Sequence, residues 1–274
     1  MRLAGLLLAF AILLLAGPAW AGEPIAIQMD GWWGGIKAAQ FLLTVETGGA
    51  EQTPANWDGA LTVNTAGLIK WLTGLVAEVR GHGQFATLRA RSELYVQHVH
   101  SNKSDRTVTV AFAGDPAIGS RTKDIETFTD PKKDARDAEN VPDLPEEQRR
   151  DTIDPIAAIL SLGRRAAGGE TRFTLPIYDG RRRFDLAVSV VGPASHNIAG
   201  KQYATIDTVA IVHPVAGFKP FHAKWWNNAK FEISIDSKSG LPLKIASDSF
   251  MAGVVLTAHA VCPPDPVCAL GQSH

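Results

Sequence analysis

Short runs of alternating residues, separated by turn-forming residues, constrain the fold of this chain more than any other feature of its sequence. In Leu75–Arg80, Glu78 and Arg80 share one face with Val76, and the opposite face is apolar, as in a half-buried strand. Ala66–Leu72 is ambiguous and suits one helical turn equally well. Because strands joined by short turns pair in antiparallel fashion, the sequence predicts a mainly β fold, a curved antiparallel meander that forms a half-barrel or a closed, barrel-like sheet. The other expected strands are Ala38–Thr47, Ala60–Asn64, Glu93–His100, Arg106–Phe112, Thr171–Ile177, Arg183–Val191, Tyr203–Val212, Phe231–Asp236, Leu241–Ser247 and Val254–Val261.

One segment departs from the strand pattern and predicts an α-helix near 154–167. Asp154 is a good N-cap, Pro155 suits the first helical position, and Gly168 suits the position just after the last turn. We expect this helix to cover the sheet or to plug one end of a barrel. Its apolar side chains fall on one narrow face at helical spacing: Ile156, Ile159 and Leu160, with Leu162 as a further candidate.

The first 21 residues have the pattern of a cleavable export signal. Arg2 precedes an apolar run from Leu3 to Ala16, and Ala19 and Ala21 are small residues at the positions that a signal peptidase recognises. The run is shorter than the roughly 20 residues that cross a bilayer, and no later stretch is long enough to do so. We therefore expect 1–21 to be removed and the remaining chain to be exported to a bacterial periplasm.

Residues 22–274 are predicted to form a single β-rich domain with a polar loop or insert at about 114–150. That segment is rich in Asp, Glu, Lys, Arg and Pro, and Phe128 is its only aromatic residue. The formal net charge of the chain is −1. This balance argues against nucleic acid as a partner, because nucleic-acid-binding domains are usually strongly basic.

The chain has two cysteines, Cys262 and Cys268, which enclose Pro-Pro-Asp-Pro-Val. In an oxidising compartment such a pair usually forms a disulfide, and the prolines bend the intervening segment in a way that brings the sulfurs together. A free pair and a metal site are the alternatives. The spacing does not suit zinc, which usually takes two cysteines separated by two to four residues and a second pair elsewhere.

The densest cluster of charges, Asp179-Gly180-Arg181-Arg182-Arg183-Phe184-Asp185, lies at a predicted Asp-Gly hairpin turn. Arg181, Arg182 and Arg183 are candidates for anion binding, because guanidinium groups bind carboxylates and phosphates through paired hydrogen bonds. The alternative is a solvated turn in which an arginine pairs with Asp179 or Asp185.

Other candidate groups favour structural roles. His98 and His100 share one strand face, which could offer two metal ligands but also suits a solvated strand end. The pairs Trp32-Trp33 and Trp225-Trp226 are expected to be buried, with exposed sugar or acyl-chain contacts as the alternative. Ser195-His196 lacks the glycines of a nucleophile elbow. The sequence has no phosphate-binding loop, dinucleotide fingerprint or metalloprotease motif, so no catalytic residue, metal or cofactor is predicted.

Four stretches resemble a bacterial exported family called domain of unknown function 3108. Relatives often carry a cysteine before the Asp-Gly-Arg turn and another before the Pro-x-x-Gly-Phe stretch, and this chain has neither. The resemblance implies a β-rich periplasmic protein without an assigned reaction, and it transfers no catalytic residues. The stretches are Asp154–Leu160, Ile177–Leu186, His213–Phe218 and Gly240–Ile245.

Three functions are compatible with these patterns. The first is a non-catalytic protein of the cell envelope that binds a lipid, a lipoprotein or a protein on a concave apolar face. The second is an envelope enzyme or binder that acts on a glycan or anionic polymer through Arg181–Arg183. The third is a scaffold that recruits proteins through 114–150. An apolar cavity would favour the first, and arginines converging with a carboxylate and a histidine would favour the second.

Overall fold

The computed structural model describes residues 24–48, 55–102, 104–113, 121–128, 144–250, 252–263 and 268. In this part of the chain, thirteen strands form one antiparallel sheet in the order β7-β6-β5-β4-β3-β2-β1-β13-β12-β11-β10-β9-β8. The strands are β1 Ile25–Trp33, β2 Ile36–Thr47, β3 Asn56–Thr65, β4 Val76–Ala86, β5 Arg89–Ser101, β6 Ser104–Ala113, β7 Arg121–Phe128, β8 Arg172–Tyr178, β9 Arg183–Ile198, β10 Lys201–Ala216, β11 Lys230–Asp236, β12 Pro242–Ser247 and β13 Val254–Cys262. The helices are α2 Gly67–Thr73, α4 Glu146–Arg149, α5 Pro155–Ala167 and α6 Pro220–Trp226.

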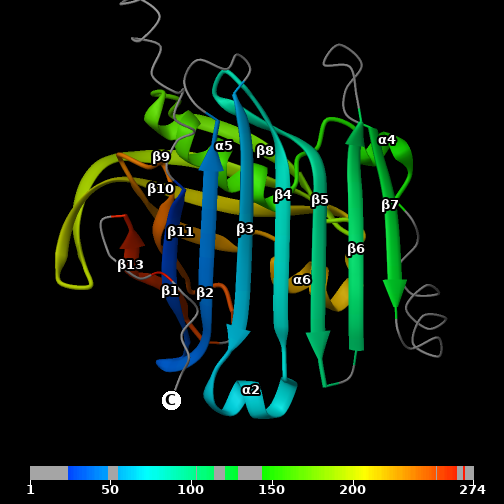
Figure 1. Ribbon diagram of the computed structural model, residues 1–274, viewed down its shortest axis with the longest axis horizontal. Helices are drawn as coiled ribbons and strands as arrows, with labels where there is room; N and C mark the ends of the chain where they lie inside the picture. Colours follow the sequence, from blue (N-terminus) through cyan, green and yellow to red (C-terminus); the bar gives the residue numbers. More distant parts are fainter. Residues whose placement is uncertain are drawn as a thin grey trace, which may run out of the picture.

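The sheet is a curved, open barrel, as the sequence predicts. Strands that are neighbours in the sheet are also neighbours in sequence, except for β1 and β13. These first and last strands pair with each other in the interior of the sheet. β2 to β7 form one wall, and β8 to β10 cross behind it at a steep angle (Figure 1). The strands at the two ends of the sheet order, β7 and β8, are not paired with each other, which leaves the barrel open.

Helix α5 fills one end of the space that the sheet encloses. Asp154 caps it and Pro155 occupies its first turn, as expected from the sequence. It lies behind β2 to β4 at one end of the wall (Figure 1). Its apolar face joins the two main clusters of the core, with Ile156 and Leu160 in one and Leu162 in the other.

Two glycines on neighbouring strands make room for the start of α5. Gly59 on β3 and Gly81 on β4 are paired in register and face the enclosed side of the sheet. A Cβ on Gly59 would lie 2.5 Å from Ile156 Cγ2, and one on Gly81 would lie 3.0 Å from Asp154 Oδ1. Larger residues at either position would push the helix off the sheet.

The structure corrects the sequence-based interpretation in three places. Residues 121–128, inside the segment 114–150 that is predicted to be a polar loop or insert, form strand β7 beside β6. An edge strand is held by backbone hydrogen bonds on one side and does not need the apolar pattern of a core strand. β1, for which the sequence analysis expects no strand, pairs on both edges. The glycine with a left-handed backbone after α5 is Gly169, with φ of 86°, whereas Gly168 has φ of −74°.

Candidate functional site

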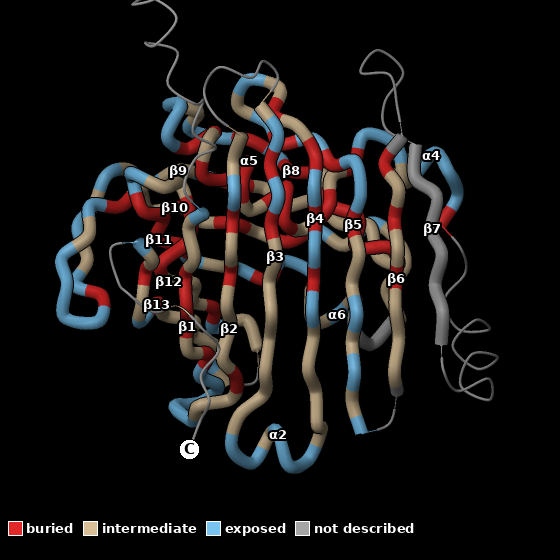
Figure 2. The backbone as a smooth tube through the Cα atoms, in the orientation of Figure 1, coloured by how far each residue is buried: buried red, intermediate tan, exposed pale blue. Residues whose placement is uncertain are grey.

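The enclosed face of the wall becomes less buried with distance from α5. Val45, Gly59, Gly81 and Tyr95 lie in register next to the helix, and all four are buried. Figure 2 shows the same gradient, with buried residues on β3 to β5 near α5 and half-buried residues toward α2. The helix therefore covers the enclosed face at one end of the wall, and the residues of that face toward α2 are less buried.

A row of apolar side chains lies at the uncovered end of the same face. Its four members are paired across β2, β3, β4 and β5 and are only half-buried, and we call them the half-buried row: Phe41, Val63, Ala77 and Val99. Arg106 of β6 pairs with Val99 and continues the row. Inward-facing side chains of a sheet are normally covered by a second layer, so this row is the candidate binding face.

The other half of the sheet contributes aromatic residues. Phe231 of β11 packs partly buried against the second core cluster. Its ring centroid lies 6.3 Å from that of Trp226 and 6.0 Å from that of Phe250, and the Trp226 and Phe250 rings are 5.3 Å apart. Such offset and edge-on contacts stabilise aromatic clusters. Like the half-buried row, this cluster is apolar, apart from the Trp226 indole N–H.

Asp154 is a buried carboxylate whose role is structural. Its Oδ1 accepts hydrogen bonds from the N–H groups of Ile156 (2.7 Å) and Ala157 (3.0 Å), and its own N–H donates to Ser92 Oγ at 2.8 Å. Burial raises its pKa to about 6, although these hydrogen bonds oppose the increase. Burial is also the main reason why the pKa of the nearby Tyr95 phenol is raised. The negative charges of Asp179 and Asp154 raise this pKa further.

The Asp-Gly-Arg turn fixes the β8–β9 hairpin to the opposite wall. Asp179 Oδ1 accepts from the N–H groups of Arg181 (3.0 Å) and Arg182 (2.7 Å), which closes the turn. Gly180, with φ of 88°, sits so close to Val108 of β6 that an added Cβ would overlap it. The motif therefore holds the two halves of the barrel together.

Two of the three candidate anion-binding arginines, Arg182 and Arg183, are engaged within their own hairpin. Arg182 Nε and Nη2 donate to Asp179 Oδ2 at 2.9 and 2.8 Å. Arg183 forms an ion pair with Asp185 and donates to the Phe184 carbonyl at 2.9 Å. These pairs match the alternative in which the turn arginines bind neighbouring aspartates. Anion binding by Arg181, Arg182 and Arg183 stays a prediction.

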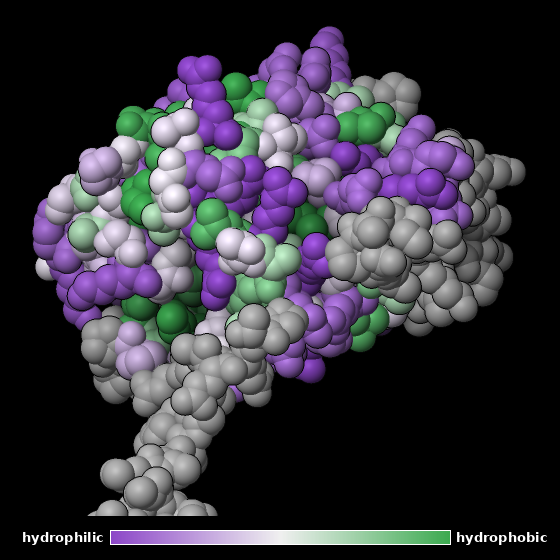
Figure 3. Space-filling model, turned by 90° about the horizontal axis from the view of Figure 1, so that it is seen from above, coloured by the Kyte–Doolittle hydropathy of each residue, from purple (hydrophilic) through white to green (hydrophobic). Residues whose placement is uncertain are grey.

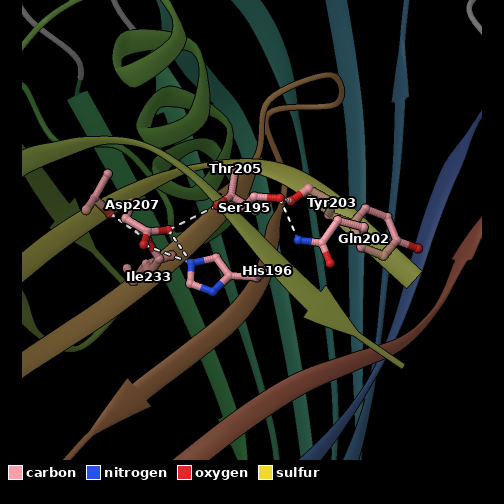
Figure 4. Close-up of polar contacts among 8 residues, drawn as sticks. Ser195, His196, Gln202, Tyr203, Thr205, Asp207 and Ile233 are labelled. Atoms are coloured by element: carbon pink, nitrogen blue, oxygen red, sulfur yellow. Dashed lines mark hydrogen bonds and ion pairs between the residues drawn. The ribbon is translucent and has the colours of Figure 1, made fainter. Parts of the chain in front are cut away.

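Ser195 and His196 do not form a catalytic pair. As consecutive residues of β9 they lie on opposite faces of the sheet. His196 Nε2 contacts both carboxylate oxygens of Asp207, at 2.8 and 3.0 Å. Ser195 Oγ instead accepts from Gln202 Nε2 at 2.7 Å and donates to the Tyr203 carbonyl at 3.4 Å (Figure 4). The histidine therefore cannot act as a base for this serine.

His98 and His100 lie exposed on the outer face of β5, which agrees with the interpretation of this segment as a solvated strand end. Asp105 contacts both, with His98 Nε2 at 2.6 Å from its Oδ1 and His100 Nδ1 at 3.5 Å from its Oδ2. The side-chain hydrogen bond from His98 lowers the pKa of the Asp105 carboxyl. Among the described residues, no group of three or more His, Cys, Asp or Glu is arranged to hold a metal ion.

The tryptophan pairs divide between the surface and the aromatic cluster. The expectation that Trp32-Trp33 is buried is wrong, because the two side chains are 39% and 43% exposed. A register shift between Gly31 and Trp32 places them at the end of the sheet, beyond the core. Trp225 and Trp226 are half-buried, and Trp226 stacks on Phe231.

Cys262 and Cys268 form a disulfide, as the sequence predicts. Cys268 Sγ also lies 3.5 Å from the Ala26 carbonyl of β1, so the bridge holds Cys268 against the start of β1. None of the described helices is long and apolar enough to cross a membrane.

A surface pocket of about 520 Å³ lies beside the disulfide, between the β9–β10 hairpin and the β11–β12 turn. Its apolar lining, which includes Tyr203 and Val261, is interrupted by Lys201, Asp236 and Lys238. It is therefore a more polar surface than the half-buried row.

The sequence profile of the family described as "Protein of unknown function (DUF3108)" matches residues 28–255. The chain belongs to this family. The match covers β2 to β12, most of β1 and only the first two residues of β13, and it includes the half-buried row. No curated protein sequence matches the chain.

The motifs of this DUF3108 member meet in space, although they are far apart in sequence. Gly163 of α5 is in contact with the Gly240 carbonyl that precedes β12. Gly217, with φ of 76°, is equally close to the Arg181 carbonyl. The motifs that identify the family therefore fix the helix, the Asp-Gly-Arg hairpin and the later turns to one another, and they form a scaffold.

Three solved structures resemble the DUF3108 chain at low identity. A β-barrel-like protein of domain of unknown function DUF1849 from Brucella abortus has a TM-score of 0.48 at 7% identity, covering 87% of this chain and 96% of its own. A Parabacteroides distasonis protein provisionally described as a lipoprotein has a TM-score of 0.37 at 6% identity, with coverage of 88% and 96%. A Vibrio parahaemolyticus domain provisionally described as an outer membrane lipoprotein-sorting protein has a TM-score of 0.22 at 10% identity, with coverage of 87% and 84%.

Sequence analysis did not identify the half-buried row. The alternation in Phe41–Val45 and in Leu61–Val63 indicates which side chains face inward, but it cannot show how far a helix covers them. The available signal was the length of α5: thirteen residues span only about 20 Å at 1.5 Å per residue.

Proposed function

We propose that this protein is exported to the cell envelope and binds a lipid acyl chain on the concave face of its sheet, without catalysing a reaction. The observation that carries the proposal is the half-buried row, a line of inward-facing apolar side chains that α5 does not cover. Burying such surface against an acyl chain is favourable by about 25 cal/mol per Å².

The chemistry of the lining supports a lipid over a polar ligand. Phe41, Val63, Ala77 and Val99 offer no hydrogen-bonding side chains, and the aromatic cluster on the other half of the sheet is also apolar apart from the Trp226 indole. Arg106 lies at the end of the row, where a guanidinium suits a carboxylate or phosphate head group. An amphiphile with one acyl chain and an anionic head matches this order of groups.

The export expected from the leader pattern supports the same function. The leader pattern in residues 1–21 and the disulfide between Cys262 and Cys268 agree on an oxidising compartment. A lipid that crosses such an aqueous space must be shielded from water, and the concavity supplies the shield.

A lysine at Val63 tests the binding face. Val63 points into the concavity from the middle of the half-buried row, so Val63→Lys places a charge where the acyl chain would lie. We expect at least a tenfold loss of affinity for a fluorescent fatty acid, measured by titration, because an uncompensated charge in an apolar site is strongly unfavourable.

Thr62→Lys is the matched control, because Thr62 is the preceding residue of the same strand and faces outward. It should bind the probe as the unmodified protein does, and thermal melting should show that both variants are folded. Equal affinities for the two variants, or no binding of the probe by the unmodified protein, would contradict the proposal.

A further inference from the structure

A second apolar surface lies outside the concavity, at the end of the barrel opposite α5. Six of the nine large hydrophobic side chains that are exposed in the described part of the chain belong to the end of β1, the start of β2 and helix α2. We call them the α2-end patch: Trp32, Trp33, Ile36, Leu68, Trp71 and Leu72.

The two parts of the patch are neighbours. Trp33 pairs with Ile36 at the β1–β2 turn. The N–H of Ala66, just before α2, donates to the Ala38 carbonyl of β2 at 2.8 Å. Figure 1 shows α2 beside the start of β2, and Figure 2 shows both segments as exposed. Figure 3, which views the opposite end of the barrel, shows hydrophilic and hydrophobic residues interspersed over its described surface.

Helix α2 presents its apolar side chains to solvent. Leu68, Trp71 and Leu72 are spaced i, i+3 and i+4, so they share one face, and they are 63%, 76% and 53% exposed. No residue of this seven-residue helix is buried. A contiguous exposed patch of this kind marks an interaction surface, because exposure to water brings these side chains no stabilisation.

The composition of the patch identifies its partner. Tryptophan and leucine beside lysine is the combination found where proteins enter the head-group region of a bilayer. Lys70 is exposed on α2, and this helix contains no acidic residue, whereas Lys37, which follows Ile36, forms an ion pair with Asp30 at 2.7 Å. The positive charge of Lys70 on an otherwise uncharged helix complements an anionic phospholipid surface.

The position of the patch points to the same partner. Val63 and Ala77 of the half-buried row lie near the ends of β3 and β4, the two strands that α2 connects. The half-buried row thus lies toward the end of the barrel that carries the patch. A protein docked by this end would present its half-buried row to the membrane from which a lipid leaves or to which it returns.

We propose that the α2-end patch docks the protein reversibly on the surface of an anionic phospholipid bilayer, with Trp71 inserted at the head-group level. This interaction goes beyond ligand binding in the concavity and does not depend on it. A shallow insertion of one helical turn suits a protein that must also leave the membrane.

Vesicle flotation of the purified protein tests the docking. Vesicles of mixed phosphatidylglycerol and phosphatidylethanolamine should carry the unmodified protein to the top of a density gradient, and vesicles of phosphatidylcholine alone should carry much less. Trp71→Ala should lower the partition coefficient about tenfold, because the largest inserted side chain is removed. Lys70→Gln should reduce the preference for the anionic vesicles.

Val191→Ala is the matched control, since Val191 is 71% exposed on β9, outside the patch. It should float as the unmodified protein does, and both exposed positions should leave the melting temperature unchanged. Equal flotation of Trp71→Ala and the unmodified protein would overturn the proposal. The proposal would also be overturned if the unmodified protein bound neither kind of vesicle. In that case a change from dimer to monomer in Trp71→Ala would show that the patch is instead a contact between two copies of this chain. Val63→Lys should still bind the vesicles, because Val63 belongs to the half-buried row and not to the α2-end patch. This result would show that docking is independent of ligand binding on the concave face.

Discussion

Replacing Gly163 with alanine should lower the free energy of unfolding by about 3 kcal/mol, at the upper end of the usual cost of overpacking. Gly163 lies in the middle of α5, where alanine would otherwise favour the helix by about 1 kcal/mol. The added Cβ would overlap the Gly240 carbonyl oxygen and lie 2.7 Å from its carbon. Because both partners are backbone, neither can rotate away, and the helix must move off the sheet. Urea unfolding followed by circular dichroism measures the change.

Gly253→Ala is the matched control for this effect. Gly253 has an ordinary backbone conformation, and its nearest neighbour to an added Cβ is the flexible Asp248 side chain at 3.3 Å. We expect a change within about 0.5 kcal/mol there. If Gly163→Ala were as stable as Gly253→Ala, the close packing of α5 on the β11–β12 turn would not exist in solution.

Asp154 should make the stability of the protein depend on pH, with a larger free energy of unfolding at pH 4 than at pH 7. Its folded pKa of about 6 lies above the unfolded value of 3.8, so the folded state binds more protons between these values. Stability from this group is therefore complete below about pH 4 and is lost as the pH rises through 6. Two pKa units correspond to about 3 kcal/mol. Asp154→Asn keeps the oxygen that accepts from Ile156 and Ala157 but does not titrate.

The measurement is the free energy of unfolding of both proteins from pH 4 to pH 7. The value for the unmodified protein minus that for Asp154→Asn should become more negative by about 3 kcal/mol across this range. The neighbouring Tyr95 phenol stays neutral throughout, because burial raises its pKa above an already high value. A difference that does not change with pH would show that the Asp154 carboxyl is not desolvated by burial under α5.

Most of the fold could be predicted from the sequence, because its determinants are local. Asp154 and Pro155 mark the start of α5 through capping preferences that act within one turn. Alternating residues such as those in Leu75–Arg80 define strands, and antiparallel hairpins join them in order. β7 could not be predicted in the same way, because an edge strand depends on backbone pairing with β6 more than on its own side chains.

The candidate site was harder to predict, because its residues are distinguished by how little of them helix α5 covers. Leu43 and Val63 both face inward, yet Leu43 is buried and Val63 is half-buried. Alternation gives them the same description, and only the length and position of α5 separate them. The Asp-Gly-Arg turn shows the opposite case, since its charges suggested a binding site and its contacts fix the barrel.

Native mass spectrometry of the protein isolated from its own host tests the central claim most directly. The unmodified protein should carry an additional mass that organic solvent extracts as an amphiphile with an acyl chain, and Val63→Lys should lack it. Protein that carries no extractable lipid, or Val63→Lys that retains the same lipid in the same amount, would contradict the claim that the concave face holds an acyl chain.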